Sequence, residues 1–143
     1  MATQSLNLLP SATTVSPFYV LPASNNGKTY KVSISALTNY IIYKDIVNKN
    51  FDYSISYTDS KAIINYTGSG LSNLIIPNNN EEPILIGTTI NIANNSSTGF
   101  LSVVSASGVS VNSAVGFNVK NYGLASLIKI DTNLWILSGD VSV

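Results

Sequence analysis

The chain has 143 residues, and its seven basic and seven acidic side chains give a net charge of zero. His, Cys and Arg are absent, so the sequence offers no imidazole for acid–base catalysis, no thiol nucleophile and no guanidinium to clamp a phosphate. This composition argues against an enzyme, a bound cofactor and a nucleic-acid partner, since the last requires clustered positive charge. A hydrophobic content of 45% is enough for the core of one domain.

No segment has the character of a membrane span or of a secretory signal. Apolar runs stay well short of the roughly 18 residues that a spanning helix requires. Residues 1–5 carry no basic side chain, and the apolar stretch after them ends at Pro10. We therefore expect folding in a cytoplasm, without membrane insertion.

Residues 1–49 are predicted to form an N-terminal arm. Prolines punctuate its extended pieces, and Asn25-Asn26-Gly27 is a strong turn signal before a short strand over residues 29–33. Ser35 suits a helix N-cap, with Leu37 and Ile41 four positions apart on one helical face. The expected arrangement is an extended arm with one short helix.

The remaining part, residues 50–143, has the periodicity of β-strands. Tyr53, Ile55 and Tyr57 alternate with Ser, and in residues 84–93 the even-numbered positions form one apolar face. Turn-forming residues cluster at 94–99, 105–108 and 131–133. Such regular spacing is typical of a sandwich or barrel. We predict a mainly β chain whose C-terminal domain is an antiparallel, jelly-roll-like β-sandwich.

The closing strand contains the only Trp of the chain. Leu134 and Ile136 share one face of this strand, and Trp135 and Leu137 share the other, so both faces are apolar. Strands that are apolar on both faces are buried on both. Trp135 is therefore expected in the core or at a subunit interface, in preference to an exposed platform for stacking sugars. Core or interface positions are expected at Ile86, Ile90, Ile128 and Trp135.

Three groups of residues are candidate sites of chemistry. Asp59, Asp131 and Asp140 stand where turns normally place Asp, which favours a structural role over a pair of catalytic carboxylates. The loop 78–82 offers oxygen ligands but lacks the alternating Asp and the fixed Gly of a calcium loop, so no metal site is expected. The tyrosines at 53, 57 and 66 are spaced so that at least two can share a glycan-binding face, although strands favour Tyr in any case.

Several segments resemble fibre and appendage proteins of tailed bacteriophages. Residues 9–15 (LPSATTV) and 27–41 (GKTYKVSISALTNYI) are similar to an N-terminal module of that family, "LPAAT … GGKTKKVTLSQLxxYI". Residues 87–94 match its "GxxIxIxN" strand, residues 120–130 follow with KNYG and a further strand, and residues 135–140 match its final "WxxxGD". In the family the N-terminal module sits at the virion-proximal end, and the C-terminal β-domains are typically trimers.

The resemblance implies a structural virion protein, made in the host cytoplasm, that decorates the head or forms a short appendage. It would form a homotrimer and bind a capsid, collar or tail protein. The attachment residues implied in the arm are Leu9, Pro10, Phe18, Tyr19, Leu37 and Ile41. The alternative function is a receptor- or glycan-binding adhesin module of a tail fibre, with a bacterial surface glycan as partner.

Overall fold

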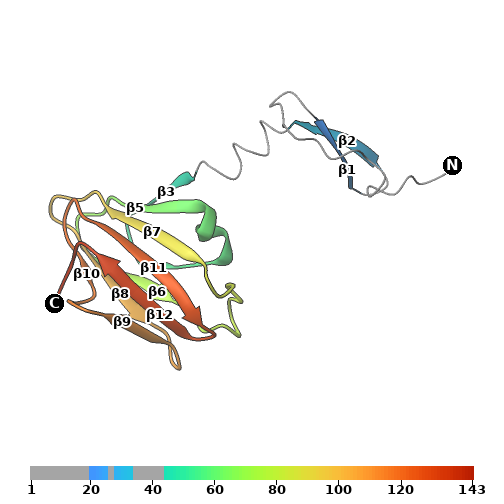
Figure 1. Cartoon of the computed structure of the whole chain (residues 1–143). Helices are drawn as coiled ribbons and strands as arrows, with labels where there is room; N and C mark the ends of the chain where they lie inside the picture. The colour runs from blue at the N-terminus through green and yellow to red at the C-terminus, as the bar shows by residue number, and fades with distance from the viewer. Residues whose placement is uncertain (1–19, 26–27, 34–43) are drawn as a thin grey trace. The chain divides into compact units, whose positions relative to one another are not determined.

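The computed structural model describes residues 20–25, 28–33 and 44–143, and the chain divides into two units, residues 1–43 and 44–143 (Figure 1). In the first unit, β1 (Val20–Asn25) and β2 (Lys28–Ser33) pair as an antiparallel hairpin on either side of the predicted turn. The predicted helix over residues 35–41 lies outside the described residues. So do all six predicted attachment residues: Leu9, Pro10, Phe18, Tyr19, Leu37 and Ile41.

The second unit, here called the β-domain, consists of two sheets (Figure 1). The six-stranded sheet has, in spatial order, β3 (Asp45–Lys49), β5 (Ala62–Tyr66), β7 (Thr89–Asn94), β11 (Leu124–Asp131), β12 (Leu134–Gly139) and β9 (Ser110–Ser113). The five-stranded sheet has β13 (Val141–Ser142), β10 (Asn118–Val119), β8 (Phe100–Ser105), β6 (Leu71–Ile76) and β4 (Tyr53–Ser54). A 3-10 helix, η2 (Tyr57–Lys61), connects β4 to β5. Residues 45–49, which were assigned to the arm, thus form an edge strand of the β-domain.

The prediction of a mainly β domain is confirmed, but the prediction of antiparallel, jelly-roll-like pairing is wrong because both sheets are mixed. From β3 to β8 the chain passes from one sheet to the other at every connection. Each strand therefore lies parallel to the strand two places earlier: β5 beside β3, β7 beside β5, β6 beside β4 and β8 beside β6. In the later part of the chain, β10 pairs antiparallel with β8 and β13, and β11 pairs antiparallel with β7 and β12. Strand β9 lies parallel to β12.

Both sheets turn one face toward a single hydrophobic core. Alternate residues point inward, as the burial of Ile90 and Ile92 on β7 and of Trp135 and Leu137 on β12 shows. The five-stranded sheet contributes Leu74, Ile76, Leu101, Val103, Val119 and Val141 to the same cluster. Burial of each large apolar side chain stabilises the fold by roughly 1.5–3 kcal/mol. The shared core makes the two sheets one folding unit.

Two predicted strands are shorter than the alternation suggested. Instead of running from residue 84, β7 begins at Thr89, because the chain bends at Gly87, whose φ of 86° favours glycine. As a result Ile84 is buried whereas Ile86 is 60% exposed. The alternation around Tyr53 and Tyr57 likewise ends early, since β4 has two residues and Tyr57 begins η2.

Candidate functional site

One end of the outer face of the six-stranded sheet is apolar. On β11 and β12 the side chains that point away from the core include Ile128, Ile130 and Ile136, which are exposed. The sheet register places Ile128 opposite Ile136. Leu85 and Ile86 lie in the segment tied to β11 by the hydrogen bond from the Gly87 N–H to the Lys129 carbonyl. We call these five exposed residues, Leu85, Ile86, Ile128, Ile130 and Ile136, the apolar patch.

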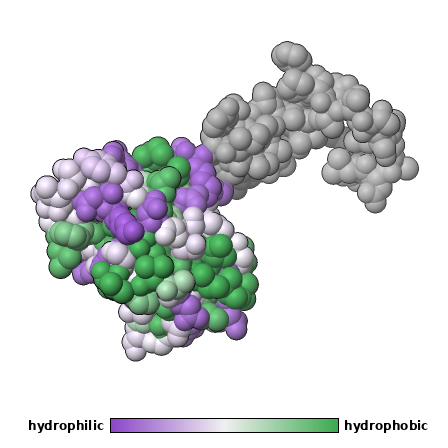
Figure 2. All heavy atoms as spheres, turned by 60° about the vertical axis from the view of Figure 1, so that its left-hand side comes forward, coloured by the Kyte–Doolittle hydropathy of each residue, from purple (hydrophilic) through white to green (hydrophobic). Residues whose placement is uncertain are grey.

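The structure separates the four residues that were predicted for the core or an interface. Ile90 and Trp135 are buried in the core, 0% and 2% exposed, whereas Ile86 and Ile128 belong to the apolar patch. Within the single chain β12 is buried on one face only, because Ile136 on its other face is 41% exposed. Figure 2 shows hydrophobic residues gathered on the surface of the β-domain, between polar ones.

Polar residues cross the middle of the same outer face. Asn91 on β7 is paired with Ser126 on β11, whose hydroxyl lies 3.1 Å from the Asn91 Oδ1, and Ser126 is paired with Ser138 on β12. Nearer the first edge of the sheet, the Asn65 amide donates to the Asn48 Oδ1 at 2.7 Å. The row formed by Asn91, Ser126 and Ser138, called the polar band, separates the apolar patch from the opposite end of the face, to which Asn65 belongs because it pairs with Ala93.

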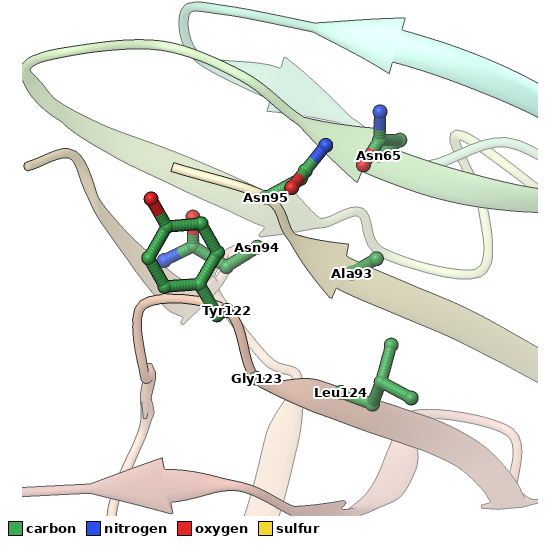
Figure 3. A pocket seen from close by; sticks show the side chains of 7 residues that line it. All are labelled: Asn65, Ala93, Asn94, Asn95, Tyr122, Gly123 and Leu124. Atoms are coloured by element: carbon green, nitrogen blue, oxygen red, sulfur yellow. The ribbon is translucent and has the colours of Figure 1, made fainter. Parts of the chain in front are cut away.

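At that opposite end lies a pocket of about 180 Å³ (Figure 3). Its lining residues are Asn65, Ala93, Asn94, Asn95, Tyr122, Gly123 and Leu124. They come from the carboxyl ends of β5 and β7 and from the turn that leads into β11. Figure 3 shows the Tyr122 ring and the side-chain amides of Asn95 and Asn65 around the pocket, and Leu124 on the neighbouring strand β11. All the lining residues are uncharged, so the pocket offers an aromatic ring, amides and aliphatic surface.

Tyr122 has an unfavourable backbone conformation. Its φ of 58° is the only positive φ of a non-glycine residue among those the structure describes. The Gly123 N–H donates to the Lys120 carbonyl at 2.9 Å, which makes Tyr122 the third residue of a four-residue turn. Glycine or asparagine is preferred at that position when φ is positive, and another residue there costs about 1–2 kcal/mol.

The turn is held in place by a buried polar network. The Asn121 amide donates to the carbonyls of Ser96 and Gly99 at 2.9 and 3.0 Å, and the Asn94 amide donates to the Val119 carbonyl at 2.9 Å. The Ser96 hydroxyl in turn donates to the Gly68 carbonyl at 2.6 Å. Asn121 is thus committed to anchoring the turn, and Tyr122, which is 70% exposed, projects beside the pocket.

Two amide side chains at the pocket keep hydrogen-bonding capacity. Within the part of the chain that the structure describes, the Asn95 side chain makes no hydrogen bond; its backbone N–H donates to the Tyr66 carbonyl at 2.8 Å. Asn65 uses its Nδ2 toward Asn48 and retains its Oδ1. An amide presents both donors and acceptors, so this pair suits a ligand with hydroxyl groups.

A buried lysine lies on the inner side of the same sheet. Lys129 is 2% exposed, and its Nζ donates to the Asn79 Oδ1 and, at 2.7 Å, to the Ile84 carbonyl. The Nζ also lies 5.6 Å from the centre of the Trp135 ring. Burial lowers the pKa of Lys129 below its ordinary value. These contacts fasten the loop before β7 to the core, a structural role that the sequence analysis missed.

The other candidates from the sequence do not converge on one site. Asp59 is buried in η2, where it accepts hydrogen bonds from the Ser56 N–H at 2.7 Å and the Tyr53 hydroxyl at 3.0 Å. Asp131 ends β11, and Asp140 accepts a bond from the Leu124 N–H at 3.1 Å. No group of three or more His, Cys, Asp or Glu that could hold a metal ion occurs among residues 20–25, 28–33 and 44–143. Over the same residues, no helix has the length and hydropathy to cross a membrane.

Comparison with known proteins gives no relative: no family model, curated protein or solved structure matches the chain.

Proposed function

We propose that this protein is a non-enzymatic structural component of a tailed-bacteriophage particle, a head fibre or a short decorating appendage. It is made in the host cytoplasm and incorporated into the virion. The β-domain forms a homotrimer. The N-terminal region, an extended arm with a short helix near residues 35–41, binds a capsid, collar or tail protein.

The apolar patch is the observation that carries this proposal. Ile128, Ile130 and Ile136 come from the neighbouring strands β11 and β12, whose inner faces are packed in the core, and these three side chains are exposed among the residues that the structure describes. Exposed apolar side chains that lie side by side on a folded domain, as Ile128 and Ile136 do, indicate an interaction site. Self-association covers such a surface with a like surface, and closed symmetry gives an assembly of defined size.

The low charge of the chain supports self-association as the way to cover the patch. Only 10% of residues are charged and the net charge is zero, so copies of the chain repel one another little. The number of copies, three, and the particle as the location rest on the resemblance of residues 9–41 and 87–140 to phage appendage proteins.

The non-enzymatic part of the proposal is supported by the positions of the three aspartates that were candidates for catalysis, Asp59, Asp131 and Asp140. Asp59 is engaged by η2, and Asp131 and Asp140 belong to different ends of the β11–β12 hairpin. Hydrolysis of a glycosidic bond needs two carboxyl groups within about 5–10 Å across a cleft.

The test is incorporation into particles. The full chain should be recovered in purified phage by mass spectrometry, and antibody labelling in electron micrographs should locate it on the head or the tail. A chain lacking residues 1–43 should remain in the lysate. If the shortened chain is incorporated like the full chain, the N-terminal region is not the anchor; if the full chain is absent from particles, the proposal as a whole is wrong.

A further inference from the structure

We propose that the Tyr122 pocket binds a single uncharged sugar unit of a surface glycan. The pocket lies at the end of the outer face away from the apolar patch, beyond the band of Asn91, Ser126 and Ser138. The pocket and the apolar patch share no residue, so the inference does not rest on the proposed role in the particle.

The unfavourable backbone of Tyr122 is the first argument. A side chain in the left-handed region is tolerated when the surrounding structure holds it there, and such residues cluster at functional sites. Here the side-chain amides of Asn121 and Asn94 hold the turn in place through their hydrogen bonds to backbone carbonyls. The Tyr122 ring is 70% exposed, so packing within the described chain does little to offset the strain. A ligand stacked on the ring supplies the missing contact.

The chemistry of the lining is the second argument. Aromatic rings pack against the apolar C–H faces of sugar rings, while amides exchange hydrogen bonds with hydroxyl groups. Tyr122 supplies the ring, and the Asn95 side chain and the Asn65 Oδ1 supply the hydrogen-bonding groups. All seven lining residues are uncharged, which favours a neutral sugar over an anionic one.

The dimensions of the pocket set the size of the ligand. At about 180 Å³ it is smaller than the roughly 300–1,000 Å³ typical of sites for drug-sized molecules, so it suits one ring of a chain that continues into solvent. A single-stranded nucleic acid could also stack on Tyr122, but its backbone requires a positively charged groove, and no Lys lines the pocket.

The experiment is an NMR titration of the full-length protein, labelled with nitrogen-15, with glucose, galactose, mannose, N-acetylglucosamine and glucuronate. At least one neutral sugar should give saturable shifts confined to residues 93–95 and 121–124, with a Kd of millimolar order, about 1 mM. Glucuronate should bind at least several-fold more weakly. Absence of saturable shifts with every neutral sugar, or a preference for glucuronate, would overturn the proposal.

Three variants separate recognition from folding. Tyr122→Gly should weaken binding at least ten-fold while the Tm stays equal or rises, because glycine accepts a positive φ without strain. Asn95→Ala should weaken binding several-fold with an unchanged Tm. Tyr57→Ala, which removes a similarly exposed tyrosine from η2, should leave both the affinity and the Tm unchanged. The assignment would be contradicted if Tyr122→Gly bound the sugar as well as the unaltered protein does. It would also be contradicted if every variant that lost binding had a lowered Tm.

Discussion

The Lys129 Nζ lies 2.7 Å from the carbonyl oxygen of Ile84, although the two residues are 45 positions apart in the chain. A second bond to the Asn79 Oδ1 brings the same loop onto the core side of β11. The ammonium group is therefore satisfied by neutral oxygens. This arrangement predicts how the protein responds to changes in either partner.

Asn79→Ala removes one acceptor from the buried ammonium group. Hydrogen bonds to charged groups contribute about 1.5–3 kcal/mol, so we expect a decrease of that size in the free energy of unfolding. Asn79→Asp instead places a carboxylate beside the Lys129 Nζ and should raise the pKa of that lysine. Chemical denaturation measures the first effect, and an NMR titration of the lysine side chain measures the second. A pKa of Lys129 unchanged by Asn79→Asp would show that the two side chains do not interact.

The lowered pKa of Lys129 predicts a dependence of stability on pH. Because burial lowers the pKa below 10.5, the unfolded chain binds the proton more tightly than the folded chain does. The free energy of unfolding should consequently rise as the pH increases from the folded-state pKa to 10.5. In Lys129→Met this increase should be lost, so the difference between the two proteins across alkaline pH is the quantity to measure. An identical pH profile for both would refute the prediction.

Tyr53 predicts the opposite trend. Burial, and next the charge of Asp59, raise the pKa of Tyr53 above 10.0. The neutral hydroxyl, which donates to Asp59, contributes stability that is present below pH 10.0 and is lost as the pH rises through the folded-state pKa. Tyr53→Phe should remove this loss. The Lys129 effect is best measured in that background, because the two pH windows overlap between pH 10.0 and 10.5.

Trp135 tests the core. Replacement by Ala should lower the free energy of unfolding by about 3–5 kcal/mol, since the ring is 2% exposed and its loss leaves a large cavity. Thermal and chemical denaturation measure this decrease, with Leu71→Ala, an exposed apolar position outside the apolar patch, as the control. A melt of Trp135→Ala equal to that of the unaltered protein would exclude a core position.

Strand β3 defines where the β-domain begins. Removing residues 1–43 should leave its stability unchanged, whereas removing residues 1–49 deletes β3 and with it the bonds of Asn65 to Asn48 and of the Thr67 N–H to the Lys49 carbonyl. The longer deletion should destabilise the domain and expose the edge of β5 to aggregation. Denaturation measures the stability of the two truncated proteins, and light scattering measures their aggregation.

The sequence pattern was informative about which residues point inward and much less so about how strands pair. Period-two alternation placed Ile90 on an apolar face, and the apolar character of both faces of the closing strand placed Trp135 in the core or at an interface, whatever the neighbouring strands. That pattern is shared by parallel and antiparallel pairs, so the parallel stacking of β3, β5 and β7 could not be inferred.

The candidate site was harder to predict from sequence for a related reason. In a turn that contains Asn121 and Tyr122, the asparagine is the residue expected to adopt a positive φ. Here Tyr122 adopts it, because the Asn121 side chain is held by hydrogen bonds to the carbonyls of Ser96 and Gly99. Lys129 falls at an inward position of β11, two residues after Leu127, but a charge normally signals a solvent-facing position. Long-range partners determine both outcomes.

The assembly of the full chain tests the central claim most directly. Light scattering coupled to size exclusion at micromolar concentration should give three times the chain mass of 15.2 kDa, and Ile128→Ser combined with Ile136→Ser should shift the protein to a monomer that remains folded. Leu71→Ser, which removes an exposed apolar side chain from the five-stranded sheet, should leave the trimer intact. A monodisperse monomer for the unaltered chain would contradict the account.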